Sequence, residues 1–389
     1  MLRDFSAPAL AMGLLTGFVG FASSFPVVLQ GLSAVGATQS QAASGLMALC
    51  LTMGLGGILL SWRHRMPISM AWSTPGAALL VTTGAVTGGF AAAVGAFIVC
   101  AGLIVATGLW RPFGRAVGAI PGPLANAMLA GILMGLCLAP VKAVAFDPWL
   151  GLPIVLAWLL VGRFNRLLAV PAALIAFVAV MLFAVDLPAQ SMTTVSEQLV
   201  PALEWVWPTF NAAAIMGIAI PLFVVTMASQ NIPGMAVLKA NHYEPAPGPL
   251  FTTSGVLSAA GAPFGGHAVN LAALTAALCA GDDAHPQPNR RYWAAVVAGV
   301  VYIAFGCLAG VTTAFVSLAP SVLIEAVAGL ALLGAFSTSA LAAFGDPRMR
   351  EAAAVTFLVT ASGISFFGVA GAFWGLLAGG LMVYLAPHR

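Results

Sequence analysis

Long apolar runs separated by short polar breaks fill almost the whole chain. Placing a span on each run predicts fourteen membrane-crossing segments, at 8–29, 38–61, 68–82, 84–109, 114–138, 148–162, 166–186, 207–228, 246–262, 266–280, 292–317, 321–344, 351–367 and 369–386. The runs are rich in Gly and Ala and lack the period-two alternation of an outer-membrane barrel. The pattern therefore predicts an all-α polytopic membrane protein.

Two of these runs contain a turn-forming cluster followed by a helix that is too short to cross a bilayer. In the stretch 66–84, Thr74 is placed to cap a helix that opens on a proline, and in 261–281 Asn270 is placed to cap a helix opening at Leu271. About ten helical residues extend roughly 15 Å, half of a ~30 Å hydrocarbon core. Two helix N-termini inside the membrane predict a binding site for an anion.

The two halves of the chain resemble each other. The segment 22–26 is echoed at 228–233, the short helices follow each other at the same spacing, and Pro123 has its counterpart at Pro320, with offsets of about 196 to 207 positions. Seven spans per repeat is an odd number, so the second repeat must be inverted in the membrane. Inverted repeats with broken helices are typical of secondary transporters.

Composition supports a membrane protein and excludes a soluble one. Hydrophobic residues make up 61% of the 389, charged residues 6%, and the mean hydropathy is +1.03. With the N-terminus in the cytoplasm, every Lys and Arg except Lys142 falls on the inner side, as the positive-inside rule requires. We therefore expect a multi-pass protein of the inner (plasma) membrane with both termini cytoplasmic. The net charge of +3 reflects this bias and indicates no nucleic-acid partner.

Other chemistry finds little support in the sequence. The opening apolar run continues to about Leu29 without a cleavage site, so we interpret it as the first span rather than a secretory signal. All five cysteines fall in apolar runs without CxxC spacing, which predicts packing and neither a disulfide nor a metal site. The basic clusters 63–65 and 290–291 are interpreted as topology signals, and the pair 282–283 as a solvated loop. A lipid-acting membrane enzyme is a remote alternative, because no DxxxD or HExxH motif occurs.

Four motifs carry a resemblance to a known family: FASSFP at 21–26, WSTPG at 72–76, SQNIPG at 229–234 and GGHAVN at 265–270. Together the motifs resemble the benzoate/proton symporter (BenE) family over essentially the whole chain. The resemblance implies the seven-plus-seven inverted-repeat fold of uracil permease, with short strands at about 68–73 and 265–269. It also implies a core domain from 1–110 and 207–318, a gate domain from 111–186 and 319–389, and an extracytoplasmic loop at 187–206.

The site differs from that of nucleobase carriers of this fold, which the resemblance implies would hold acidic side chains on spans 8 and 10. The corresponding stretches here offer Ser229, Gln230, Asn231, His267 and Asn270, with no carboxylate. Neutral donors and helix N-termini attract an anion, whereas a fixed negative charge would repel one. This chemistry favours an organic anion. The resemblance implies that the anion is an aromatic carboxylate, benzoate, imported by proton symport through alternating access, without cofactor. Another organic or inorganic anion or a nucleobase remains an alternative cargo. Assembly into a homodimer is a separate point that the sequence leaves open.

The candidate substrate-binding residues have structural interpretations as well. For the ring these are Phe18, Phe21, Phe25 and Trp72, and for the carboxylate they are Ser73, Thr74, Gln230, Asn231, His267 and Asn270. The phenylalanines could instead pack against neighbouring helices. Ser73 and Thr74 would cap the short helix in either case. An amide pair in mid-membrane is costly unless its groups are satisfied, which favours a role for Gln230 and Asn231.

Two side chains are candidates for the coupled proton. His267 lies within a span and titrates near neutrality when unperturbed, although a neutral imidazole bonded to a carbonyl is the structural alternative. Glu325 is a carboxylate deep in an apolar run, where ionised burial costs on the order of 3 kcal/mol. Its repeat counterpart lies near Asn126, so a hydrogen bond within the gate domain is the competing interpretation.

Overall fold

The computed structural model describes residues 6–185 and 202–385. Helices dominate, and seven of those described are long and apolar enough to cross a membrane, with an eighth if the bent pair 288–306 and 309–317 forms one span. The exact number of fourteen spans stays a prediction. Residues 187–201 of the predicted extracytoplasmic loop at 187–206 lie outside the described residues.

The first half of the chain runs from the N-terminus to α10. Its elements are α1 (Ala7–Ala22), α2 (Phe25–Ala34), α3 (Gln39–His64), β1 (Met70–Trp72), α4 (Thr74–Thr83), α5 (Gly89–Leu109), α6 (Arg111–Gly118), α7 (Gly122–Cys137), α8 (Ala139–Phe146), α9 (Pro148–Phe164), a 3₁₀ turn (Arg166–Leu168) and α10 (Ala169–Phe183).

The second half of the chain runs from α12 to α21. Its elements are α12 (Ala212–Ala214), a π-helical turn (Ile215–Ala219), α13 (Ile220–Thr226), a second π-helical turn (Met227–Asn231), α14 (Ile232–Ala240), α15 (Pro247–Gly261), a 3₁₀ turn (Ala262–Phe264), β2 (Val269–Leu271), α16 (Leu274–Ala280), a 3₁₀ turn (Pro288–Arg290), α17 (Tyr292–Gly306), α18 (Ala309–Ser317), α19 (Ser321–Phe344), α20 (Arg350–Ala361), β3 (Ser365–Phe366), β4 (Val369–Ala370) and α21 (Gly371–Leu385).

Several predicted span boundaries are wrong. The first span reaches Ala34, interrupted at Ser23 and Ser24, rather than ending at residue 29. The predicted fifth span divides, because α6 is a separate helix and the crossing segment runs through α7 and α8 to Phe146. Lys142 therefore lies on the exposed face of α8 rather than in a loop.

The predicted eighth span also ends too early. The helix continues from Ala212 to Ala240 through two prolines, with a π-helical turn immediately before each proline-containing segment. Proline lacks an N–H and clashes with the carbonyl four residues earlier, and the wider π turn accommodates both effects. Pro221 and Pro233 thus reshape this helix without ending it.

The region between the last two predicted spans is a hairpin. Strands β3 and β4 pair antiparallel, with Ser365 opposite Ala370, so the helices flanking them stop at Ala361 and restart at Gly371. Phe367 and Gly368 both have positive φ at the hairpin tip, which matches the tight turns that two-residue hairpins use.

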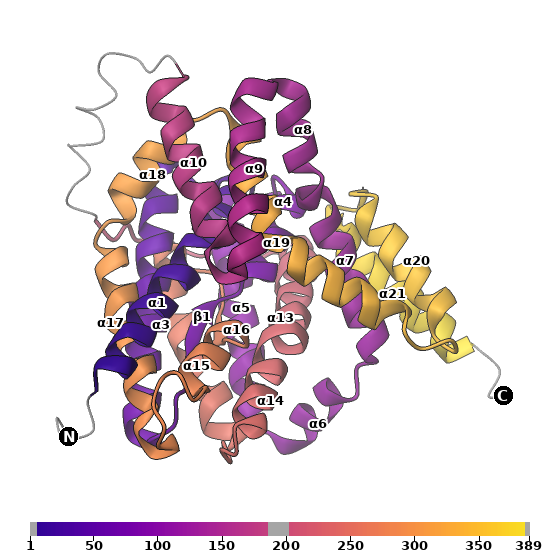
Figure 1. Cartoon of the computed structure of the whole chain (residues 1–389). Coiled ribbons are helices and arrows are strands. Elements are labelled where there is room, and N and C mark those ends of the chain that lie inside the picture. Colours follow the sequence, from indigo (N-terminus) through magenta and orange to yellow (C-terminus); the bar gives the residue numbers. More distant parts are fainter. Residues whose placement is uncertain (1–5, 186–201, 386–389) are drawn as a thin grey trace.

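Two sets of helices pack mainly within themselves. α17 packs on α1 and α3 while α15 packs on α5, and separately α7 packs on α19, α20 and α21. In Figure 1, α1, α3 and α17 lie on the opposite side of the molecule from α20 and α21. The sets correspond to the segments expected to form core and gate, whose boundaries stay a prediction.

Candidate substrate site at a two-stranded ribbon

The centre of the molecule holds a short antiparallel ribbon formed by β1 and β2. Met70 lies opposite Leu271 and Trp72 opposite Val269. The first strand lies within the predicted stretch 68–73, but the second lies at 269–271 rather than 265–269. The ribbon brings together two segments that are far apart in sequence, and a short helix follows each strand.

Our interpretation of Asn270 and Leu271 as helix cap and helix start is wrong. Both residues belong to β2, and α16 begins only at Leu274. The amide of Asn270 is satisfied when its oxygen accepts from the Ser73 N–H (3.0 Å) and its nitrogen donates to the Leu271 carbonyl (2.9 Å). These bonds hold the segment extended, so backbone pairing across the ribbon overrides the local capping signal.

Some backbone groups of the ribbon point away from the partner strand and need hydrogen-bond partners elsewhere. At its two ends the Ser73 N–H donates to the Ala268 carbonyl (2.8 Å) and the Ala272 N–H to the Ser69 carbonyl (3.0 Å). Paired residues in an antiparallel ladder alternate between bonded and non-bonded pairs, so the residues between turn their polar groups outward. Inside a membrane such groups need partners from the protein.

Two serines supply these partners in the same manner. Ser61 of α3 accepts from the Ile68 N–H (3.1 Å) and donates to its carbonyl (3.0 Å). Ser258 of α15 accepts from the Val269 N–H (2.8 Å), and its hydroxyl lies within donating distance of the Ser254 carbonyl (2.8 Å) and of the Val269 carbonyl (3.2 Å). The separation of the two serines along the chain falls within the repeat offset, which supports the inverted repeat.

A second matched pair of contacts ties the ribbon to the first and eighth spans. The Trp72 Nε1–H donates to Ser24 Oγ (2.9 Å) at the break between α1 and α2, and the Leu271 N–H donates to Asn231 Oδ1 (2.9 Å) in the second π-helical turn. Ser24 and Asn231 are also related by the repeat offset. Asn231 is completely buried and acts here as an anchor of β2.

The first short helix begins one residue earlier than expected from its cap. Ser73 rather than Thr74 is the N-cap, and its hydroxyl accepts from the Gly76 N–H (3.2 Å) and from Thr226 Oγ1 (2.8 Å). α4 then runs for 10 residues, roughly 15 Å. It therefore starts inside the protein, as the sequence indicated.

The second short helix differs from the first. α16 has 7 residues and no side-chain cap, and near its start Ser69 Oγ donates to Thr275 Oγ1 (2.8 Å). At the other end, Arg291 donates to the Ala280 carbonyl (2.7 Å) and forms an ion pair with Asp282. Arg291 is only 5% exposed, so it caps α16 in addition to any role as a topology signal.

Aromatic rings gather beside β1. Phe21 stacks on Phe25 (centroids 5.0 Å apart) and on Phe305 (4.4 Å), and meets Trp72 edge-on (5.8 Å). Phe18 lies at the edge of this group, 40% exposed and 6.4 Å from Phe305. Phe25 opens α2, after the break, so the three predicted phenylalanines span two helices. Sequence reasoning missed Phe305, whose only signal was its place on the partner helix α17.

His267 lies at the entrance to β2 and is completely buried. Its Nδ1 accepts from the Ala268 N–H (2.6 Å), its ring meets Phe97 edge-on, and Nε2 has no hydrogen-bond partner among the described residues. Thr74 and Gln230 are half-buried. Glu325 is half-buried on α19, in the other helix set, and the structure does not place it on the ribbon.

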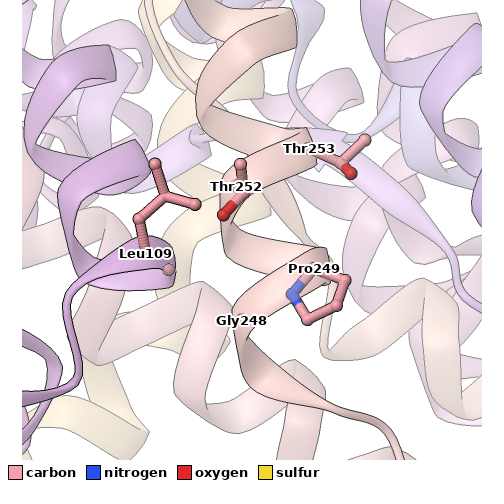
Figure 2. A pocket seen from close by; sticks show the side chains of 6 residues that line it. Leu109, Gly248, Pro249, Thr252 and Thr253 are labelled. Atoms are coloured by element: carbon pink, nitrogen blue, oxygen red, sulfur yellow. The ribbon is translucent and has the colours of Figure 1, made fainter.

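Two pockets lie away from the ribbon. One of about 350 Å³ lies between the end of α5 and the start of α15 and is lined by Gly108, Leu109, Gly248, Pro249, Thr252 and Thr253. Figure 2 shows Thr252 facing Leu109 across this pocket. The other, of about 500 Å³, follows α14 and is lined by Lys239, His242, Tyr243, Glu244 and Pro245. Neither pocket contains a predicted site residue.

Comparison with solved structures confirms the fold class. The transmembrane domain of the cyanobacterial bicarbonate transporter BicA is similar with a TM-score of 0.60 and 14% identity, covering 97% of this chain and 98% of that one. SLC26A9 is similar with a TM-score of 0.64 and 14% identity, covering 99% of this chain and 66% of that one. The chain thus shares the mostly helical, multi-pass membrane fold of these two proteins.

Comparison of sequences shows the family. The family described as "Benzoate membrane transport protein" (BenE) matches residues 3–385. The "Inner membrane protein YdcO" of Escherichia coli is 39% identical over 98% of this chain and 96% of its own length. The "Benzoate membrane transport protein" of Acinetobacter baylyi is 32% identical over the same shares. These matches set aside the lipid-enzyme alternative: the chain is a membrane transporter that belongs to the BenE family.

Proposed function

We propose that this transporter imports an aromatic carboxylate, benzoate first, together with a proton, by alternating access across the inner membrane. The observation that carries the proposal is the ribbon site itself. A 10-residue helix starts there inside the protein, surrounded by neutral polar groups, and no predicted binding residue is acidic. The relative named for benzoate transport supports the choice of substrate.

The electrostatics favour one end of the site. A helix N-terminus carries about half a positive charge, concentrated on its free N–H groups. α4 offers this end beside Thr74, whereas α16 is shorter and its start is occupied by the contact between Ser69 and Thr275. We therefore place the substrate carboxylate nearer α4, rather than midway between two equivalent helices.

The aromatic group beside β1 would receive the substrate ring. Phe21, Phe25 and Trp72 are 5% exposed or less and already contact one another. A benzoate ring would join this group by stacking or edge contacts, each worth about 0.5–1.5 kcal/mol beyond the burial of area. Ring binding therefore favours benzoate over an inorganic anion of the same charge.

Transport requires the helices that bind the substrate to move relative to the other helices of the protein. The helix set of α1, α3, α5, α15 and α17 would form the core that carries substrate, and the set of α7–α10 and α19–α21 the gate. The coupled proton would travel on His267 or Glu325. Both termini would lie in the cytoplasm, because this orientation keeps the basic residues inside.

Proteoliposomes test the proposal. Labelled benzoate uptake should rise when the outside is made acidic and collapse when an uncoupler is added. Competition with unlabelled uracil, sulfate and dicarboxylates then distinguishes the alternative cargoes, because a benzoate carrier is inhibited by aromatic carboxylates alone. Uptake that ignores the proton gradient would refute symport, and inhibition by uracil or sulfate would refute the substrate assignment.

A further inference from the structure

The hydrogen bonds around the ribbon separate substrate binding from proton carriage. We propose that His267 is a permanently neutral donor that binds the substrate carboxylate through Nε2–H, and that the coupled proton travels elsewhere. The inference rests on the proposed function, since it concerns the same anion site. The sequence left two roles open for this histidine, substrate binding and proton carriage, and the proposal keeps substrate binding alone.

The tautomer follows from the contact at the other ring nitrogen. Nδ1 of His267 accepts a hydrogen bond from the Ala268 N–H at 2.6 Å, and a nitrogen that accepts cannot itself carry a proton. A neutral imidazole has one N–H, so the proton is on Nε2. A second proton could bind only at Nδ1, where it would face the Ala268 N–H and break that bond.

Among the described residues, the helices that pack on β2 or on the His267 ring carry no acidic residue. The helices α4, α5 and α15 contain no acidic or basic residue, and the titratable group they carry is the buried thiol of Cys100. On α3 the titratable groups are the buried Cys50 and, at the far end of the helix, Arg63 and His64, and on α14 the charged group is Lys239 in the last turn. A charged imidazole would thus be buried without a partner, which costs far more than a neutral one.

The remaining donor points to a ligand. His267 is 0% exposed and its Nε2 has no partner among the described residues, and an unmade bond of this kind typically costs about 1–3 kcal/mol. The other fully buried polar candidates are already engaged: Ser73 by Gly76 and Thr226, Asn231 by Leu271. A carboxylate acceptor would satisfy the His267 donor.

The position of His267 fits the carboxylate end of the site. His267 immediately precedes Ala268, whose carbonyl accepts from the N–H of the α4 cap, Ser73. The backbone of His267 therefore lies at the same end of the ribbon as the start of α4, and its ring contacts Phe97 of α5. Dipoles and neutral donors would hold the substrate charge there, and Glu325 becomes the leading candidate for the proton.

The test compares His267→Gln and His267→Ala with wild type in proteoliposomes, with thermal unfolding of each purified variant as a folding check. Glutamine places an amide donor near the position of Nε2 but cannot titrate. We expect His267→Ala to raise the KM for benzoate roughly tenfold or more, the range for a lost bond to a charged group. His267→Gln should recover much of that loss, and both should keep the wild-type ratio of uptake with and without a proton gradient.

Two results would overturn the inference. One is a His267→Gln variant that exchanges benzoate but no longer responds to the gradient, since the histidine would then carry the proton. The other is an unchanged KM in both variants. If His267→Ala does not fold, the glutamine variant alone decides. Failure of the proposed function is distinct, because wild-type uptake would then lack gradient dependence or benzoate selectivity.

Discussion

The two serines that hold the ribbon edges allow a quantitative test of why this fold can place strands inside a membrane. Ser258→Ala removes the acceptor of the Val269 N–H, whereas Ser61→Ala leaves the Ile68 N–H with a second acceptor, the Met66 carbonyl at 2.8 Å. Both serines are at most 1% exposed, so water cannot replace the lost partner. Ser258→Ala should cost about 1–3 kcal/mol, the usual penalty for a buried polar group left unpaired, and Ser61→Ala should cost less because the Ile68 N–H keeps a partner.

A matched control separates this effect from the loss of any buried hydroxyl. Thr313 is 5% exposed and donates to the Ala309 carbonyl (2.7 Å), which lies four residues earlier on the same helix. Thr313→Val removes that bond but leaves no N–H unpaired, so about 0.6 kcal/mol is expected, the average for such bonds in membranes.

Unfolding of the purified protein in mixed micelles, followed by fluorescence of its 9 tryptophans, measures all three variants. Ser258→Ala should be destabilised more than Ser61→Ala and more than Thr313→Val, because it leaves the Val269 N–H without an acceptor. Equal stability of all three would show that the ribbon edges find other partners and that the serines do not fix the strands.

Two further predictions concern packing and charge. Arg291→Gln should lower the free energy of unfolding by about 2–3 kcal/mol, because a buried guanidinium that bonds the Ala280 carbonyl is lost. Removal of the exposed Asp282 carboxylate should have little effect. The same unfolding assay compares the two variants, and equal losses would contradict the capping role of Arg291. Gly54→Ala should destabilise by about 1–3 kcal/mol because its methyl group would lie 2.6 Å from the Gly299 carbonyl oxygen. Gly102→Ala, which meets nothing within 4 Å, is the matched control, and similar behaviour of the two alanine variants would refute close contact between α3 and α17.

The sequence alone established the class of protein and the short first helix, and it predicted the repeat. Hydrophobic runs and scarce charges leave a membrane bundle as the consistent answer, and Ser73–Pro75 is a local signal that starts a helix wherever the segment lies. Such features depend on neighbours along the chain. The family resemblance added the ribbon, which three-residue strands in an apolar run would not have revealed.

Boundaries and partners were decided in three dimensions. Pro221 and Pro233 did not end their helix, because the π-helical turns accommodate the missing N–H and the steric clash of each proline. Asn270 became a strand residue, because its amide oxygen accepts a hydrogen bond from the Ser73 N–H, almost two hundred residues away. Phe305 could not be assigned to the site from the sequence, because its contact with Phe21 depends on the packing of α17 against α1. For Asn270 and Phe305 the deciding contact joins groups distant in sequence. Inside a membrane an unpaired backbone group is so costly that tertiary partners prevail over local propensity.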